Sequence, residues 1–209
     1  FIVDASQSVP HMKVDVKAIG CDFLFFTGHK VFADSGIGIL WGKEELLSEM
    51  ECVFSWGWAI ADVQKDSYRS CGLPDKYEPG TPNVTGAVSL LKAFEYIDSI
   101  GWYETIEKIE NDLVKYFLEK ANKFKWMKIV WSTQSKNRVS VFWFTLEWHH
   151  SNDIAEYLAD NNIAVRSWKH CAQPLFKAYW EPHSVRASLY IYNTTEEIDT
   201  LFKVLETLK

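Results

Sequence analysis

The chain has 209 residues, of which 47% are hydrophobic and 24% charged, and its formal net charge is −6. This composition excludes a disordered chain, because the apolar residues suffice for a buried core. The acidic balance excludes a general attraction to nucleic acid or to an anionic membrane. No apolar run is long enough to span a membrane and the first residues carry no basic region, so we expect a cytoplasmic protein without a signal peptide.

Two apolar runs near the start of the chain end in polar residues. The run 1–3 is followed by Asp4, and the run 22–26 is followed by Thr27-Gly28-His29-Lys30. Both runs predict buried strands, and each delivers polar side chains at its carboxyl end.

A third strand is predicted over 37–41, and a helix from Lys43 to about Met50 follows it. Residues 55–83 lack periodicity and contain several glycines and prolines, which indicates a long loop. Long loops inside compact domains are commonly functional, so we expect this segment to take part in binding.

The second half of the chain alternates helical and strand patterns. Residues 83–125 are helical with a break at Ile100-Gly101, and beyond them we expect a C-terminal helix capped by Thr194 or Thr195. The remaining predicted elements are strands over 139–146, 163–166 and 185–192 and helices over 152–161 and near 174–177. This order predicts an α/β half-domain over 1–97 followed by a small α+β domain over 98–209.

The two polar strand ends suggest one chemistry when they are taken together. Asp4 and the run from Thr27 to Lys30 place an acid, a hydroxyl, an imidazole and an amine at one edge of a sheet, where open α/β folds bind ligands. Pyridoxal phosphate (PLP) uses such a set, because its ring nitrogen pairs with a carboxylate, its aldehyde with a lysine and its phosphate with polar donors. Singly, Asp4 reads as a helix cap and Lys30 as a surface lysine; jointly, they favour a PLP site.

Four ordered segments carry a resemblance to a known family. They are 3–11 (VDASQSVPH), 22–30 (DFLFFTGHK), 77–83 (YEPGTPN) and 165–174 (VRSWKHCAQP), and Arg186-Ala187-Ser188 and Tyr192-Asn193-Thr194 follow them. With these motifs the chain resembles the Suf-type cysteine desulfurases of the class V aminotransferase superfamily. The resemblance implies the type I fold of PLP-dependent transferases, with the second half of the large domain and the small C-terminal domain present. Members of the family are longer than this chain, so we expect the isolated chain to be inactive.

The resemblance implies a role for each polar residue of the cofactor site. Asp4 would pair with the pyridine nitrogen of PLP, and Gln7 would donate a hydrogen bond to the ring oxygen. Thr27 and His29 would hold the phosphate. Lys30 would bond the cofactor aldehyde and then move the Cα proton of the substrate.

It also implies how the substrate and its sulfur are handled. Arg166 and Arg186 would bind the substrate carboxylate, a task for which the planar guanidinium is well suited. Cys171 would be the nucleophile that takes the sulfur as a persulfide, with His170 as a further catalytic residue. We expect the cations of Lys169 and His170 to favour the thiolate of Cys171, although by base rate a lone cysteine is a buried structural thiol.

The remaining cysteines and histidines give weaker signals. Cys21 reads as a core residue, whereas Cys52 and Cys71 read as loop thiols without an assigned role. The pair His149-His150 lacks a neighbouring Cys or carboxylate pattern, so we expect a solvated turn there and no metal site.

The function implied is a cysteine desulfurase that converts L-cysteine to L-alanine and passes the sulfur to an acceptor protein of iron–sulfur cluster assembly. The resemblance further implies a homodimer in which Thr81 reaches the phosphate site of the other subunit. The alternatives within the fold are a selenocysteine lyase, an aminotransferase or an epimerase, and outside it a non-catalytic, truncated module.

Tryptophan is unusually abundant. The chain has ten tryptophans and ten glycines, whereas average glycine usage predicts roughly 15 glycines. In the resembled family, glycine is usual at six positions that hold tryptophan here: Trp56, Trp58, Trp131, Trp148, Trp168 and Trp180. One hypothesis explains both the excess and the deficit: these codons are read as glycine in the source. The alternative is a set of remodelled loops.

Overall fold

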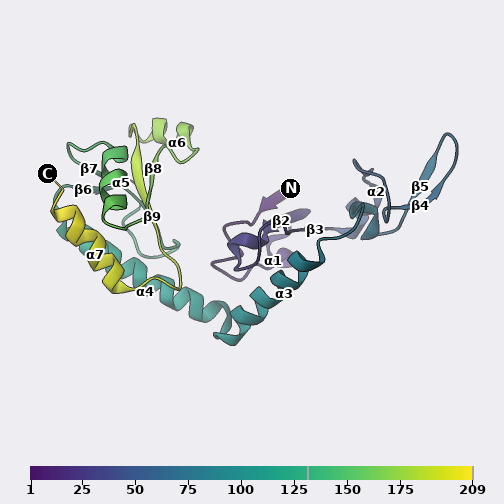
Figure 1. Cartoon of the computed structure of the whole chain (residues 1–209), viewed down its shortest axis with the longest axis horizontal. Coiled ribbons are helices and arrows are strands. Elements are labelled where there is room, and N and C mark those ends of the chain that lie inside the picture. Colours follow the sequence, from purple (N-terminus) through teal and green to yellow (C-terminus); the bar gives the residue numbers. More distant parts are fainter. Residues whose placement is uncertain (131, 209) are drawn as a thin grey trace. The chain divides into compact units, whose positions relative to one another are not determined.

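The computed structural model describes residues 1–130 and 132–208. The chain forms two compact units, Phe1–Tyr103 and Glu104–Lys209 (Figure 1). The boundary expected at 97/98 falls inside helix α3 (Val84–Ser99), shortly before that helix ends.

The first unit contains a three-stranded sheet in the order β1-β2-β3, which confirms the three predicted strands. Its strands are β1 (Ile2–Asp4), β2 (Phe23–Thr27) and β3 (Gly38–Gly42). β1 runs parallel to β2, and β3 runs antiparallel to β2. The parallel pair brings the carboxyl ends of β1 and β2 to the same edge of the sheet, as the sequence predicts.

Short helices lie between and after these strands. They are α1 (Val16–Ile19), the 3-10 helix η1 (Gly28–Lys30), α2 (Glu44–Glu49) and the 3-10 helix η2 (Asp75–Tyr77). α2 matches the predicted helix. α1 was not predicted, because its four residues are too few to show a helical period, and it is set by a local cap in which Asp15 accepts hydrogen bonds from the amides of Lys17 and Ala18.

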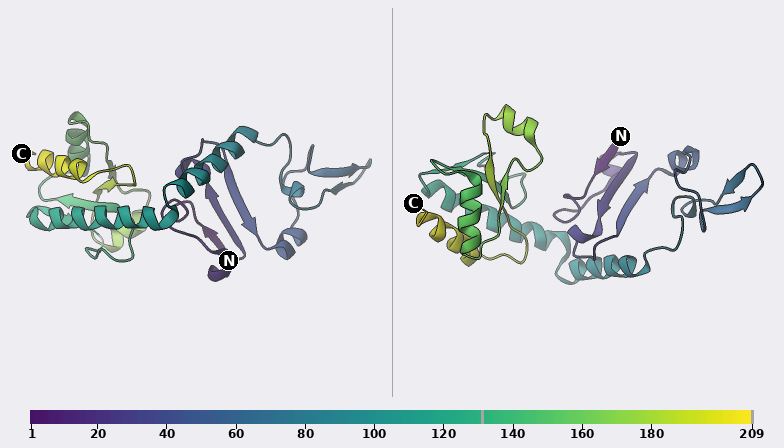
Figure 2. Two further views of the ribbon diagram at one scale, coloured as in Figure 1. Left: turned by 90° about the horizontal axis from the view of Figure 1, so that it is seen from below. Right: turned by 45° about the horizontal axis from the view of Figure 1, so that its top comes forward.

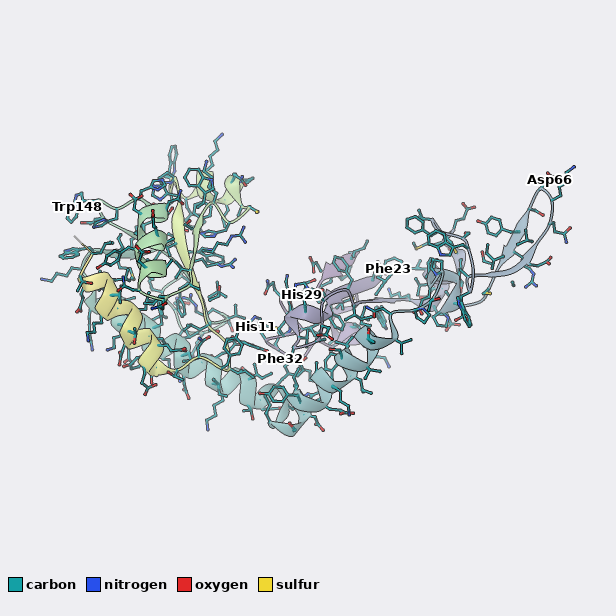
Figure 3. All side chains as sticks on the ribbon, viewed as in Figure 1. His11, Phe23, His29, Phe32, Asp66 and Trp148 are labelled. Atoms are coloured by element: carbon teal, nitrogen blue, oxygen red, sulfur yellow. The ribbon has the colours of Figure 1, made fainter. Side chains whose placement is uncertain are left out.

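A hairpin interrupts the segment predicted to be loop. Its strands are β4 (Ile60–Val63) and β5 (Tyr68–Ser70), which pair antiparallel. Asp66 lies at its tip (Figure 3), where the amide of Gln64 donates to the carbonyl of Ser67 across 2.8 Å. Most residues of both strands are exposed, so the sequence lacks the alternation of apolar and polar residues by which half-buried strands are recognised.

Two long helices follow, α3 and α4 (Trp102–Lys123), and the predicted break between them is confirmed. Gly101 lies in this break with a φ of 98°, a conformation that glycine adopts without strain. α3 lies alongside the three-stranded sheet (Figure 2), and Phe94 meets Phe26 of β2 edge to face at 6.3 Å. Asn83 caps α3 by accepting from the amide of Gly86, and its side-chain amide donates to the carbonyl of Gly36.

The second unit is an antiparallel sheet in the order β6-β7-β9-β8 with helices beside it, which fits the predicted α+β domain. The strands are β6 (Met127–Ile129), β7 (Val141–Leu146), β8 (Arg166–Trp168) and β9 (Ser184–Ser188). The helices that follow α4 are α5 (Ser151–Asp160), α6 (Gln173–Ala178) and α7 (Thr195–Glu206). β6 was not predicted, β8 begins where the predicted strand 163–166 ends, and β9 ends before the predicted 192.

The core of this unit lies between the sheet and helices α4, α5 and α7. Along β7, buried and half-buried residues alternate, so Phe142 and Phe144 face the core. Phe117 of α4 stacks on Phe142 with ring centroids 3.7 Å apart. The intervening Trp143 points to the other face of the strand, where the candidate site of this unit lies.

Candidate active site

Asp4 ends strand β1 with an exposed carboxylate. Its Oδ1 accepts a hydrogen bond from the amide of Ser6 at 2.9 Å. Hydrogen bonds from the side chain and then the amide of Ser6 hold the pKa of Asp4 below its ordinary value, and the charge of Lys30 acts in the same direction. Asp4 is therefore ionised at neutral pH, and its carboxylate lies within electrostatic range of the Lys30 amine.

Thr27 ends strand β2, and η1 turns the chain directly after it. His29, labelled in Figure 3, and Lys30 therefore follow at the same edge of the sheet. Thr27 Oγ1 and His29 Nδ1 share a hydrogen bond of 2.9 Å. Gly28 between them is buried, and a Cβ built on it would lie 2.4 Å from Cγ2 of Ile37. This turn therefore requires glycine, a constraint that the sequence alone does not show.

Gln7 and Thr81 are both exposed. Gln7 lies in the turn after β1, where the amides of Ser8 and Val9 donate to the carbonyl of Ala5. Thr81 follows Gly80, whose φ of 86° is left-handed and whose amide donates to the carbonyl of Gly57. Among the described residues, neither Gln7 nor Thr81 is hydrogen-bonded to Asp4 or Lys30, so their cofactor roles stay predictions.

In the second unit, Arg166 of β8 lies directly opposite Arg186 of β9 in the sheet register. Burial and then the charge of Arg166 lower the pKa of Arg186 from its ordinary value, yet a guanidinium stays charged in proteins. Nε of Arg186 is buried and finds no partner among the residues that the structure describes. Two adjacent cations with an unused buried donor are suited to bind an anion such as a carboxylate.

Cys171 is exposed and follows β8 on a short loop. Nη2 of Arg166 donates to its Sγ at 3.3 Å. His170 and Cys171 have φ values of 50° and 60°, so two consecutive residues are left-handed, and such strain is found preferentially at functional sites. The amide of Ala172 donates to the carbonyl of Lys169 and closes the turn.

His170 differs from its expected role as a cation beside the thiol. Burial, followed by the charges of Arg186 and Arg166, lowers the pKa of His170 to about 4, so its ring is neutral at pH 7. Its Nε2 shares a hydrogen bond of 3.0 Å with the hydroxyl of fully buried Ser184. The Lys169 amine lies over the ring of Trp168 at 5.4 Å. The cation at the thiol is therefore Arg166, and the expectation for His170 was wrong in this respect.

A mostly apolar pocket borders this loop. Trp143, Phe176 and Tyr179 line it together with His170 and Arg186. The pocket places apolar surface next to the guanidinium of Arg186, an arrangement that suits a small ligand with one charged end.

Two residues that the sequence did not single out form hydrogen bonds with the site residues. Ser6 hydrogen-bonds Asp4, and Ser184 hydrogen-bonds His170. The carboxylate of Asp4 accepts from the amide two residues ahead, a turn that aspartate commonly forms at such a position. Ser184 carried no signal, because its partner lies on a loop whose course depends on the tertiary fold.

Cys21 is buried, as predicted, and Cys52 and Cys71 are partly buried in the segment around the hairpin. Across 1–130 and 132–208, no three His, Cys, Asp or Glu side chains gather in a way that could hold a metal ion. Over the same residues, no helix has both the length and the apolarity needed to cross a membrane.

Residues 1–201 match the protein family described as Aminotransferase class-V. Among curated proteins, the "Probable cysteine desulfurase" of Halalkalibacterium halodurans is 41% identical over 208 residues, which are 100% of this chain and 50% of that protein. The protein of the same description from Streptomyces coelicolor is 39% identical over 99% of this chain and 49% of its own length. The chain thus spans about half the length of the curated relatives it matches.

Solved structures give the same picture. The apo cysteine desulfurase from Thermococcus onnurineus NA1 superposes with a TM-score of 0.93 at 38% identity and covers 99% of this chain and 51% of its own. The cysteine desulfurase CsdA from Escherichia coli superposes with a TM-score of 0.89 at 30% identity over 98% of this chain and 50% of its own.

Proposed function

Since the chain belongs to the class-V aminotransferase family, we propose that it supplies the lysine, the cofactor-holding residues and the nucleophilic cysteine of a PLP-dependent cysteine desulfurase, as the C-terminal half of a longer enzyme. One observation carries the desulfurase assignment: exposed Cys171 receives a hydrogen bond from Arg166, which lies opposite a second arginine. A thiol held by a carboxylate-binding cation is suited to meet the sulfur of an amino acid.

The first unit fits PLP by its donor set. Asp4 is ionised and near Lys30, which suits a protonated ring nitrogen and an aldehyde-bonding amine. Thr27 and His29 present a hydroxyl and an imidazole at the same sheet edge, where Gly28 leaves no side chain in the turn, and these would hold the phosphate. When bound, PLP supplies an electron-withdrawing ring that stabilises negative charge at the substrate Cα.

The residues of this chain then divide the chemistry. Lys30 takes the proton from Cα and returns protons to the product. Arg166 and Arg186 bind the carboxylate of L-cysteine. Sγ of Cys171 attacks the substrate sulfur: an S–S bond forms, the C–S bond breaks, and its electron pair stays on carbon, which is protonated to give L-alanine. The persulfide left on Cys171 carries the sulfur away from the substrate.

Neutral His170 has a positioning role in this scheme. Its ring is fixed by Ser184 on one side and packs near Phe176, with centroids 5.7 Å apart, on the other. His170 therefore fixes the backbone directly before Cys171 and adds no charge beside the thiol.

The partners follow from the chemistry proposed. A persulfide must be discharged to an acceptor thiol, and we assign that role to a sulfur-acceptor protein of iron–sulfur cluster assembly in the cytoplasm. Thr81, exposed in the Gly80 turn, is proposed to complete the phosphate site of a second copy in a homodimer. Light scattering on the full-length enzyme tests this, and a monomer that is both cofactor-loaded and active would refute the dimer.

The cofactor assignment is tested by chemical trapping. Borohydride reduction of the full-length enzyme with PLP, followed by peptide mapping, should place the label on Lys30. A label on another lysine, such as Lys43, would refute the assignment.

The nucleophile is tested by Cys171→Ala in the full-length enzyme, with Cys71→Ala as the matched control. The absorbance change on adding L-cysteine should survive in both variants, because Lys30 is intact. Alanine release should fall on the order of a thousandfold or more in Cys171→Ala only. Near-normal desulfuration would exclude the persulfide role, and selenocysteine turnover that persists alone would favour a selenocysteine lyase.

A further inference from the structure

The backbone at several tryptophans adopts a conformation that suits glycine. Trp58, Trp148, Trp168 and Trp180 have φ values of 73°, 64°, 87° and 57°. A positive φ is uncommon for any residue with a side chain, and for a bulky one it is a genuine outlier. The values for Trp58 and Trp168 match those of Gly20 (71°) and Gly80 (86°) in the same chain.

Burial does not compensate these four positions. The indoles of Trp58, Trp148 and Trp180 are 71%, 84% and 92% exposed, and Figure 3 shows Trp148 at the margin of the second unit. Trp168 is 47% exposed and has the largest φ of the four. A strained residue is normally retained where its surroundings hold it in place, and the exposed indoles of Trp58, Trp148 and Trp180 lack such surroundings. The half-exposed ring of Trp168 does stack on His183, with centroids 6.3 Å apart, so at this position the argument rests on its φ of 87°.

The other tryptophans behave differently. Trp143 lies within strand β7 and lines the pocket near Cys171. Trp102 also has a positive φ, of 62°, but its ring packs on Tyr103 with centroids 5.5 Å apart. Trp56 is not among the left-handed residues, and Trp131 lies outside the described residues. The two criteria, positive φ and an indole nearly half exposed or more, thus select four of the six positions that composition and resemblance had singled out.

We propose that the chain made in the source organism carries glycine at positions 58, 148, 168 and 180, and that the codons for these positions are read there as glycine. Glycine removes the strain at each turn and also accounts for the shortage of glycine in the sequence. At position 168 it has a consequence for the site: the loop from β8 to Cys171 loses an indole, and the Lys169 amine loses the ring over which it lies.

Peptide mass spectrometry of the protein purified from its source decides the proposal. The tryptic peptide 139–166 contains both Trp143 and Trp148, so one fragment-ion series reads the test position and its control. The peptide 178–186 contains Trp180. We expect tryptophan at 143 and glycine at 148 and 180. Tryptophan at 148 and 180 would overturn the proposal.

The preference of these four turns for glycine can be tested separately in recombinant chains. The fourfold variant Trp58→Gly, Trp148→Gly, Trp168→Gly, Trp180→Gly should unfold at a higher midpoint of urea than the chain with four tryptophans. The control Trp143→Gly should unfold at a lower midpoint, since that position is a pleated strand with ordinary φ. A midpoint for the fourfold variant equal to or below that of the parent would show that these turns do not prefer glycine.

Discussion

Gly28 is the residue on which the turn from β2 into η1 depends. A Cβ there would lie 2.4 Å from Cγ2 of Ile37, a β-branched side chain that cannot swing aside, and 3.3 Å from the carbonyl oxygen of Ile37. Gly28→Ala should therefore lower the free energy of unfolding of the first unit by about 1–3 kcal/mol. Urea denaturation measures this.

Gly72→Ala is the matched control, because a Cβ at Gly72 would meet nothing within 4 Å. Its unfolding free energy should stay within about 0.5 kcal/mol of the parent. An equal loss in both variants would show that the Ile37 contact is not the cause.

Arg166 is the cation that the structure places on the Cys171 sulfur. Arg166→Gln removes a charge-assisted hydrogen bond of 3.3 Å and should slow the reaction of Cys171 with iodoacetamide at pH 7 several-fold. Lys169→Gln should change the rate little, since that amine lies over the ring of Trp168. Mass spectrometry of the labelled peptide gives both rates, and the reverse order of effects would reinstate Lys169 as the activating cation.

Individual residues differ in how far the sequence predicts them. The meeting of Asp4 with the Thr27–Lys30 turn could be predicted, because parallel strands necessarily bring their carboxyl ends to one edge. The neutrality of His170 could not, because its lowered pKa arises from burial and from two arginines on neighbouring strands.

Among the helices, α7 has the most complete set of local signals. Thr194 caps it in a capping box with Glu197, and Ile198, Leu201, Phe202 and Leu205 are buried along one side. Thr194→Ala should cost about 1 kcal/mol of stability. Thr195→Ala, one residue further along, removes no cap and should cost much less, as thermal or urea unfolding will show; equal losses would contradict the capping assignment.

Elements that bury one face can be predicted from the sequence, and exposed or very short elements cannot. α7 and β7 each bury one face, so apolar residues recur with a period of 3.6 along the helix and of 2 along the strand. β4 and β5 are largely exposed, and β6 has only three residues, so none of them shows a usable period. These elements depend on pairing with a neighbouring strand, which is information that lies elsewhere in the chain.

At the scale of the whole molecule, the two units should respond differently to mild acid. Burial lowers the pKa of His170 to about 4, and it also lowers that of His183. Unfolded histidine has a pKa of about 6.5, so between that pH and about 4 the unfolded state binds more protons than the folded state. The stability of the second unit should therefore fall as pH falls through this window.

In the first unit, no histidine has a lowered pKa of this kind. The hydrogen bond from Lys43 lowers the pKa of its Asp22 from the ordinary value of 3.8, so the stabilising effect of this pair is lost only below that pH. Urea unfolding, monitored by a probe in each unit, should give a lower free energy of unfolding at about pH 5 than at pH 7 in the second unit alone. His170→Gln should reduce that loss, and a second unit as stable at about pH 5 as at pH 7 would contradict the prediction.

The carboxylate site proposed at the opposed arginines of β8 and β9 predicts that the buffer anion affects the stability of this protein. Any small carboxylate that occupies them in the folded state alone raises the unfolding free energy by mass action, by about 1.4 kcal/mol at ten times its Kd. Propionate should therefore raise the melting temperature above that in chloride at equal ionic strength, and Arg186→Gln should abolish the difference. Samples exchanged from a carboxylate buffer into chloride would lose this ligand without any change in their sequence.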